Sequence, residues 1–228
     1  MMKRLFGIMA AVCWLAFGIT GVIRWIAGDG NLLAAEMLRA APPEVTGLPE
    51  KDYPGVGAMT ADYLTGKLDA FQYTPGQEAG TEGAPTEVFQ AHEASHMEDC
   101  RGLIRLDTAV CIGCGIAALL FTAAGLIRRE GRRTFLKGFL CGMCGFAGVA
   151  VILGIWAAAD FNGLFVTFHR IAFRNDGLLL DPRTDLLIRL MPTAFFVRLG
   201  ILGLLRFAAM PVIMAAAAGI GLRKKDEV

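Results

Sequence analysis

Charged side chains are missing from three long stretches of this 228-residue chain, 5–23, 108–127 and 138–159. Each stretch holds 19 to 22 residues, and a helix needs about 20 apolar residues to cross the hydrocarbon core of a bilayer. Hydrophobic residues make up 55% of the chain and the mean hydropathy is +0.52. These values exclude an ordinary soluble domain.

A fourth apolar stretch, about 194–222, is interrupted only by Arg198 and Arg206. We therefore expect an all-α membrane protein that forms a single integral membrane domain over residues 1–228. Its four transmembrane helices are predicted at about 5–26, 106–127, 138–159 and 194–222. The segments at about 27–105 and 160–193 are expected to form an extracytoplasmic cap of helices and loops.

Basic residues are scarce in the segment 24–107, which holds 6 Lys and Arg against 14 Asp and Glu. The two ends of the chain and the link between the second and third spans instead hold ten bases: Lys3, Arg4, Arg128, Arg129, Arg132, Arg133, Lys137, Arg223, Lys224 and Lys225. Because cytoplasmic loops are enriched in Lys and Arg, both termini are predicted to be cytoplasmic. The sequence has no basic patch that would bind nucleic acid, and it does not predict an oligomeric state.

Prolines and glycines interrupt the segment after the first span, which predicts two short helices at 31–41 and about 60–73. No proline follows Pro85 until Pro182. A longer helix is therefore expected to begin near Thr86, as its N-cap, and to run into the second span. Four side chains would share one side of it: His92, His96, Asp99 and Leu103.

Histidine is rare in this chain, and His92, His96 and His169 all fall in the two predicted extracytoplasmic segments. An imidazole titrates near neutral pH, which suits it to proton transfer. One histidine in each segment permits a shared catalytic site. The alternative is a structural or solvated role.

Residues 92–96 read His-Glu-Ala-Ser-His, which matches the H-E-x-x-H pattern of zinc proteases. Such an enzyme needs a third protein ligand, and no such ligand follows in the same helix; His169 could serve only if the two segments converge. A zinc-dependent membrane protease is therefore kept as an alternative. We expect no metal and no cofactor.

The cysteines include two C-x-x-C pairs, Cys111 with Cys114 and Cys141 with Cys144. Counted along their spans at about 1.5 Å per residue, the pairs differ in depth by roughly 10 Å. That is too far to share one tetrahedral zinc ion. We interpret them as small residues at helix contacts, with a quinone-linked thiol oxidoreductase as the alternative.

Arg198 and Arg206 are charges inside an apolar span, where a charge usually faces a cavity or a partner. We predict that both bind substrate. Arg206, about two turns deeper, would reach a lipid headgroup or a substrate carbonyl. The alternatives are snorkelling of Arg198 to the interface and an ion pair of Arg206 with an Asp.

Two sequence blocks, in order, resemble those of the bacterial lipoprotein intramolecular transacylases. Phe89-Gln-Ala-His-Glu-Ala-Ser-His-Met-Glu-Asp-Cys-Arg is similar to F-x-x-x-E-x-x-H-M-x-D-V-K, with Cys100 where Val is usual. The second block begins Thr167-Phe-His-Arg-Ile-Ala-Phe-Arg-Asn-Asp and continues with Leu180-Asp-Pro-Arg-Thr-Asp. It is similar to F-H-x-x-x-F-x-N-D-x-W-x-L-D-P-x-T-D, with Gly177 where the tryptophan is expected.

The resemblance implies a bacterial plasma-membrane acyltransferase whose partners are a diacylated lipoprotein substrate and membrane lipid. It would move the sn-2 acyl chain of the lipoprotein to the α-amino group of its N-terminal cysteine, which gives the lyso-form. The resemblance also implies that His96 and His169 carry the chemistry, which makes the H-E-x-x-H string accidental.

The chemistry itself is within reach of two imidazoles. The attacking amine must lose a proton and the departing glyceryl oxygen must gain one, so general acid and base groups are needed. Supporting roles are predicted for Glu93 and Asp99, which would orient His96, and for Asn175 and Asp176. The remaining alternative is a non-catalytic membrane protein that binds lipid or a partner.

Overall fold

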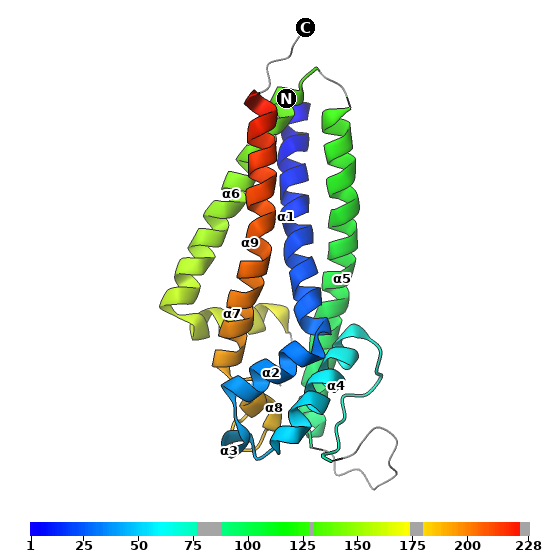
Figure 1. The fold of residues 1–228 in the computed structure, drawn as a ribbon, viewed down its shortest axis with the longest axis vertical. Helices are drawn as coiled ribbons and strands as arrows, with labels where there is room; N and C mark the ends of the chain where they lie inside the picture. The colour runs from blue at the N-terminus through cyan, green and yellow to red at the C-terminus, as the bar shows by residue number, and fades with distance from the viewer. Residues whose placement is uncertain (77–87, 128–129, 174–179, 224–228) are drawn as a thin grey trace. The chain divides into compact units, whose positions relative to one another are not determined.

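The computed structural model describes residues 1–76, 88–127, 130–173 and 180–223, and the regular secondary structure of these residues is helical. Four helices are long and apolar enough to cross a membrane. They are α1 (Met2–Gly28), α5 (Ala91–Leu126), α6 (Arg132–Ala159) and α9 (Thr193–Arg223) (Figure 1). Each matches a predicted span, which confirms the all-α, four-span fold.

The chain forms two compact units, each built from segments that are distant in the sequence. The bundle unit comprises residues 1–22, 107–160 and 204–228, and the histidine unit comprises residues 23–106 and 161–203. All three histidines belong to the histidine unit. The boundary between the units falls inside the continuous helices α1, α5 and α9.

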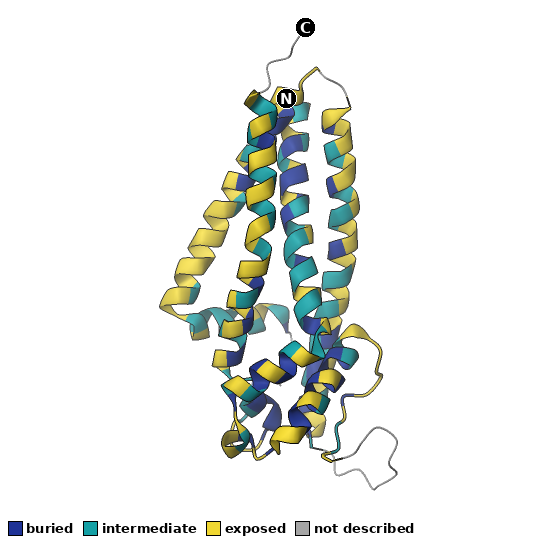
Figure 2. Ribbon diagram, in the orientation of Figure 1, coloured by how far each residue is buried: buried dark blue, intermediate teal, exposed yellow. Residues whose placement is uncertain are grey.

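The bundle unit is held together by small residues that allow helices to touch. A Cβ atom added at Gly7 of α1 would lie 2.1 Å from the carbonyl oxygen of Phe135 in α6. One added at Gly138 would lie 2.1 Å from the carbonyl oxygen of Arg4. Because packing between membrane helices depends on such close approach, neither position tolerates a side chain. The C-terminal half of α6 is exposed and apolar, as a lipid-facing surface requires (Figure 2).

The histidine unit has its own apolar core, in which α2 (Gly30–Ala40) packs against α4 (Tyr53–Thr65). Asp29 caps α2 by accepting a hydrogen bond from the Leu32 amide at 3.0 Å. Three short helices complete the unit together with α7 (Phe161–Ala172): α3 (Pro43–Thr46), η1 (Glu50–Asp52) and α8 (Leu186–Leu190). The segment after the first span is thus better packed than its many prolines and glycines suggest.

Two of the predicted helices have wrong boundaries. The helix expected at 60–73 is α4, which begins at Tyr53 because Pro54 occupies its first turn, where a missing N–H costs nothing. It ends at Thr65, and the φ of 85° at the following Gly66 is left-handed. The long helix expected to begin near Thr86 begins instead at Ala91, since residues 88–90 are not helical. Thr86 lies outside the described residues.

Candidate active site

The two histidines predicted to share a site do lie together. His96 comes from α5 and His169 from α7, and their ring centroids are 6.2 Å apart with the ring planes inclined by only 11°. Both side chains are partly exposed. A hydrogen bond needs a heavy-atom separation of about 3 Å, so one ester beside the pair is within reach of both rings.

The ring of His169 is oriented by its own helix. Its Nδ1 atom lies 2.8 Å from the carbonyl oxygen of Phe165, one turn earlier in α7. A carbonyl oxygen only accepts hydrogen bonds, so Nδ1 carries the proton in this geometry. In the neutral ring, Nε2 then holds the free lone pair, which is the atom that can take a proton from a substrate.

Aromatic side chains surround this pair. The Phe165 ring centroid lies 4.0 Å from that of His169, and Phe173 lies 5.2 Å from His96 and 5.3 Å from His169. Phe165, His169 and Phe173 recur every four residues, so they follow one side of α7 and its end. An apolar wall of this kind lowers the local dielectric and is compatible with acyl chains.

The surroundings of His96 favour the neutral form of its ring. Burial lowers the pKa of His96, the neighbouring His169 lowers it further, and the negative charge of Asp99 partly opposes both effects. The Nε2 atom of His96 lies 3.6 Å from the sulfur of Cys100. Burial raises the pKa of the Cys100 thiol to about 12, with a smaller contribution from Asp99, so the thiol keeps its proton at neutral pH.

Glu93, predicted to orient His96, is fully buried and binds two backbone amides. One carboxylate oxygen accepts from the Gln90 amide at 2.7 Å, which closes the first turn of α5 as in a capping box. The other accepts from the Leu187 amide of α8 at 2.7 Å. Glu93 therefore joins the start of α5 to α8 and stabilises the part of α5 that carries His96.

The two histidines of the H-E-x-x-H string have different partners. His92 Nε2 lies 3.0 Å from a carboxylate oxygen of Asp185, whereas His96 faces His169. Among the described residues, no three His, Cys, Asp or Glu side chains converge in a way that could hold a metal ion. All six cysteines, including both C-x-x-C pairs, are free thiols.

The remaining predicted residues differ in what surrounds them. Arg198 donates from Nε to Glu36, a carboxylate that is 2% exposed and also pairs with Arg39 at 2.8 Å. The hydrogen bond from Arg198 lowers the pKa of Glu36 below its usual range. Arg206 lies two turns further along α9 and is exposed. Asn175 and Asp176, like Gly177, lie outside the described residues.

Three features around the histidines were not predicted from the sequence. They are the Phe165 carbonyl that orients His169, the contact of Cys100 with His96, and the wall formed by Phe165 and Phe173. The four-residue spacing within α7 was a usable signal for the wall. No separate helix was predicted at this position in the segment 160–193.

The apolar helices define a polytopic membrane protein, and the two neighbouring imidazoles are its candidate active site. The model of the family "Lipoprotein intramolecular transacylase Lit" matches residues 6–196. The chain belongs to this family, and it is therefore a membrane-integral acyltransferase, as the two sequence blocks predicted. No curated protein matches the chain.

The solved structures most relevant to the fold are of the membrane-integral lipoprotein intramolecular transacylase Lit from Bacillus cereus. One has a TM-score of 0.70 at 18% identity and covers 96% of this chain and 95% of that chain. A structure with a histidine-to-arginine mutation has a TM-score of 0.67, covering 96% and 91%, again at 18% identity. At this identity, the likeness supports the fold alone.

Proposed function

We propose that this protein moves the sn-2 acyl chain of a diacylglyceryl lipoprotein to the α-amino group of that lipoprotein's N-terminal cysteine. His96 and His169 would act as the acid–base pair. The observation that carries the proposal is the meeting of these two rings, 6.2 Å apart, in a chain of this family. The product would be a lyso-form lipoprotein with one ester-linked chain left on the glyceryl group.

In this proposal, His169 is the general base. Its Nδ1–H donates to the Phe165 carbonyl, which leaves Nε2 to accept the proton of the attacking amine. A new C–N bond forms as the amine adds to the ester carbonyl, and the sn-2 C–O bond then breaks. His169 returns the proton to the departing glyceryl oxygen, so the enzyme ends in its starting state.

His96 would act as a neutral hydrogen-bond donor to the ester carbonyl. The lowered pKa of His96 favours the uncharged ring, which avoids a second positive charge beside His169 when that ring is protonated. If the Cys100 thiol donates to Nε2, the proton of His96 is on Nδ1, and this N–H is available to the developing oxyanion.

Binding of the lipoprotein would supply much of the rate acceleration. Amine and ester belong to one lipoprotein molecule, so the site has to hold a single substrate in a reactive geometry. No covalent acyl-enzyme is required. The charge distribution of the loops supports an extracytoplasmic site with cytoplasmic termini, and membrane lipid would surround the substrate chains.

The test is mass spectrometry of a lipoprotein's N-terminal peptide after reaction with the purified enzyme. We expect one acyl chain to move from oxygen to nitrogen with no change in total acyl content, and His96→Gln and His169→Asn to abolish the transfer. His92→Gln is the matched control, because His92 pairs with Asp185 and not with the site. Transfer at the normal rate by either dyad variant would refute the mechanism.

The same assay separates the alternatives. A zinc protease would lose activity in a chelator and would cleave the peptide chain. A non-catalytic lipid-binding protein would leave the acyl chain where it was. Transfer by a metal-free preparation, with an intact peptide chain, supports the transacylase.

A further inference from the structure

A cavity of about 490 Å³ lies on the side of α5 that faces away from the histidine pair. Its α5 lining includes Ala94, Glu98, Arg101 and Arg105, which recur every three or four residues and form one stripe. His96 is two positions from both Ala94 and Glu98, and so lies on the opposite side of the helix. The volume is in the range of small-molecule sites, roughly 300–1,000 Å³.

Arg101 enters this cavity as an incompletely compensated cation. Its side chain is 10% exposed, and its Nε is buried with no hydrogen-bond partner in the described part of the chain. The terminal nitrogens make two long contacts with Asp69, 3.5 Å to the carbonyl and 3.8 Å to a carboxylate that is itself fully exposed. The guanidinium also lies over the Tyr63 ring at 4.9 Å.

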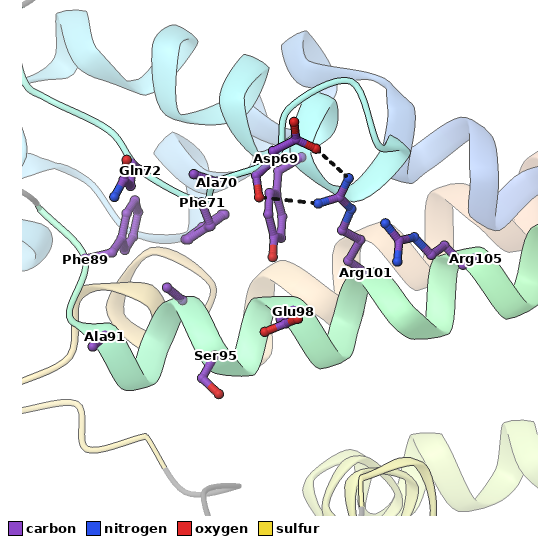
Figure 3. Close-up of a pocket in the computed structure, with 12 residues that line it drawn as sticks. Asp69, Ala70, Phe71, Gln72, Phe89, Ala91, Ser95, Glu98, Arg101 and Arg105 are labelled. Carbon is purple, nitrogen blue, oxygen red and sulfur yellow. Dashed lines mark hydrogen bonds and ion pairs between the residues drawn. The ribbon is translucent and has the colours of Figure 1, made fainter.

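A second guanidinium lies beside the first. Figure 3 shows Arg101 and Arg105 extending from α5 to the same side of the helix, with Asp69 near Arg101 only. Like charges one helical turn apart repel each other, and a buried cation is costly without a close partner. An anion that accepts hydrogen bonds from both side chains removes both costs, and a phosphate suits the arginine fork best.

The cavity also carries negative charge. Glu98 lies one turn before Arg101 on the same stripe, about 5–6 Å away between Cβ atoms. A ligand with a phosphate and an ammonium group at this spacing would pair with both the arginines and Glu98. Arg105 lies one turn before the charge-free stretch 108–127, which is where the headgroup region of a bilayer would begin.

We propose that this cavity binds the headgroup of a zwitterionic phospholipid, with its phosphate at Arg101 and Arg105 and its ammonium group toward Glu98. The bound lipid is distinct from the substrate of the proposed reaction, because a diacylglyceryl lipoprotein has no phosphate in its lipid group. The site therefore does not depend on the proposed function.

Native mass spectrometry of the whole protein, released from an uncharged detergent, tests this proposal by titration with dihexanoyl phosphatidylethanolamine. We expect saturable binding that weakens at least tenfold in Arg105→Gln, which is exposed and will fold, and in Arg101→Gln. Glu98→Gln should lose the preference for phosphatidylethanolamine over phosphatidylglycerol while keeping the affinity for the latter. Arg183→Gln, an exposed arginine outside the cavity, should bind as the wild type does.

Three results would overturn the proposal. Unchanged affinity in Arg105→Gln would exclude the arginine site. Equal binding of dihexanoylglycerol would exclude a role for the phosphate. Equally tight binding of inorganic phosphate would assign the cavity to a free anion and exclude a lipid.

Discussion

Replacing the buried Glu93 by Gln should weaken the fold more than the chemistry. The carboxylate accepts two backbone hydrogen bonds at 2.7 Å, from Gln90 and from Leu187, and it is fully buried. Glutamine keeps one acceptor oxygen and turns an NH₂ group toward the other amide. Losing one charge-assisted bond and weakening the second should cost about 2–4 kcal/mol of the free energy of unfolding.

Thermal unfolding of the purified protein, followed by tryptophan fluorescence, measures this effect. For a chain of this size the expected cost lowers the melting temperature by about 4–16 °C. Glu50→Gln, at an exposed carboxylate of the same unit, should leave it unchanged. A Glu93→Gln protein that melts with the wild type but transfers no acyl chain would refute the reasoning and would place Glu93 in the reaction.

Three further predictions concern the groups around the histidines and the ion pair of α9. Asp99→Asn removes a charge that raises the pKa of His96. The acid limb of the pH profile of kcat/KM should therefore move to lower pH. A shift to higher pH would contradict the proposed neutral ring. Burial raises the pKa of Cys100 to about 12, so iodoacetamide should alkylate this thiol at pH 8 about a thousandfold more slowly than a free cysteine. Peptide mass spectrometry measures the rate. Rapid labelling would indicate a thiolate–imidazolium pair. Arg198→Gln leaves Glu36 buried with one partner fewer, so the protein should lose about 3 kcal/mol of stability and its melting temperature should fall by several degrees. The double variant Glu36→Gln, Arg198→Gln should recover part of the loss. A higher KM with normal stability would instead support the predicted substrate contact.

The membrane spans were predictable because length and lack of charge are sufficient to define them. Apart from Ile127, which follows the end of α5, the charge-free stretches lie inside long helices, and the fourth span was predicted in spite of its two arginines. Helix starts outside the spans were less predictable. Pro54 was interpreted as a break, although proline in a first turn is compatible with a helix, and the start of α5 depends on a side-chain cap from Glu93.

The histidine pair was predicted from two separate sequence blocks, and the structure brings His96 and His169 together. Its immediate surroundings were not predictable in the same way. The orientation of His169 depends on a backbone carbonyl, which has no signature in the sequence. The partner of Arg198 is Glu36, far away in the chain, and only the packing of α9 within the histidine unit brings the two together.

Helix α7 has a further consequence for how a lipid substrate enters and leaves. None of its residues is buried, and Phe168 and Ile171 are 53% and 78% exposed. An element with so little buried area separates from its neighbours at a low cost in free energy. Brief detachment of α7 would part the two imidazoles and open a sideways route for bulky acyl chains, while the helical content of the protein stayed almost constant. Inactivation by heat or detergent would then precede any change in circular dichroism.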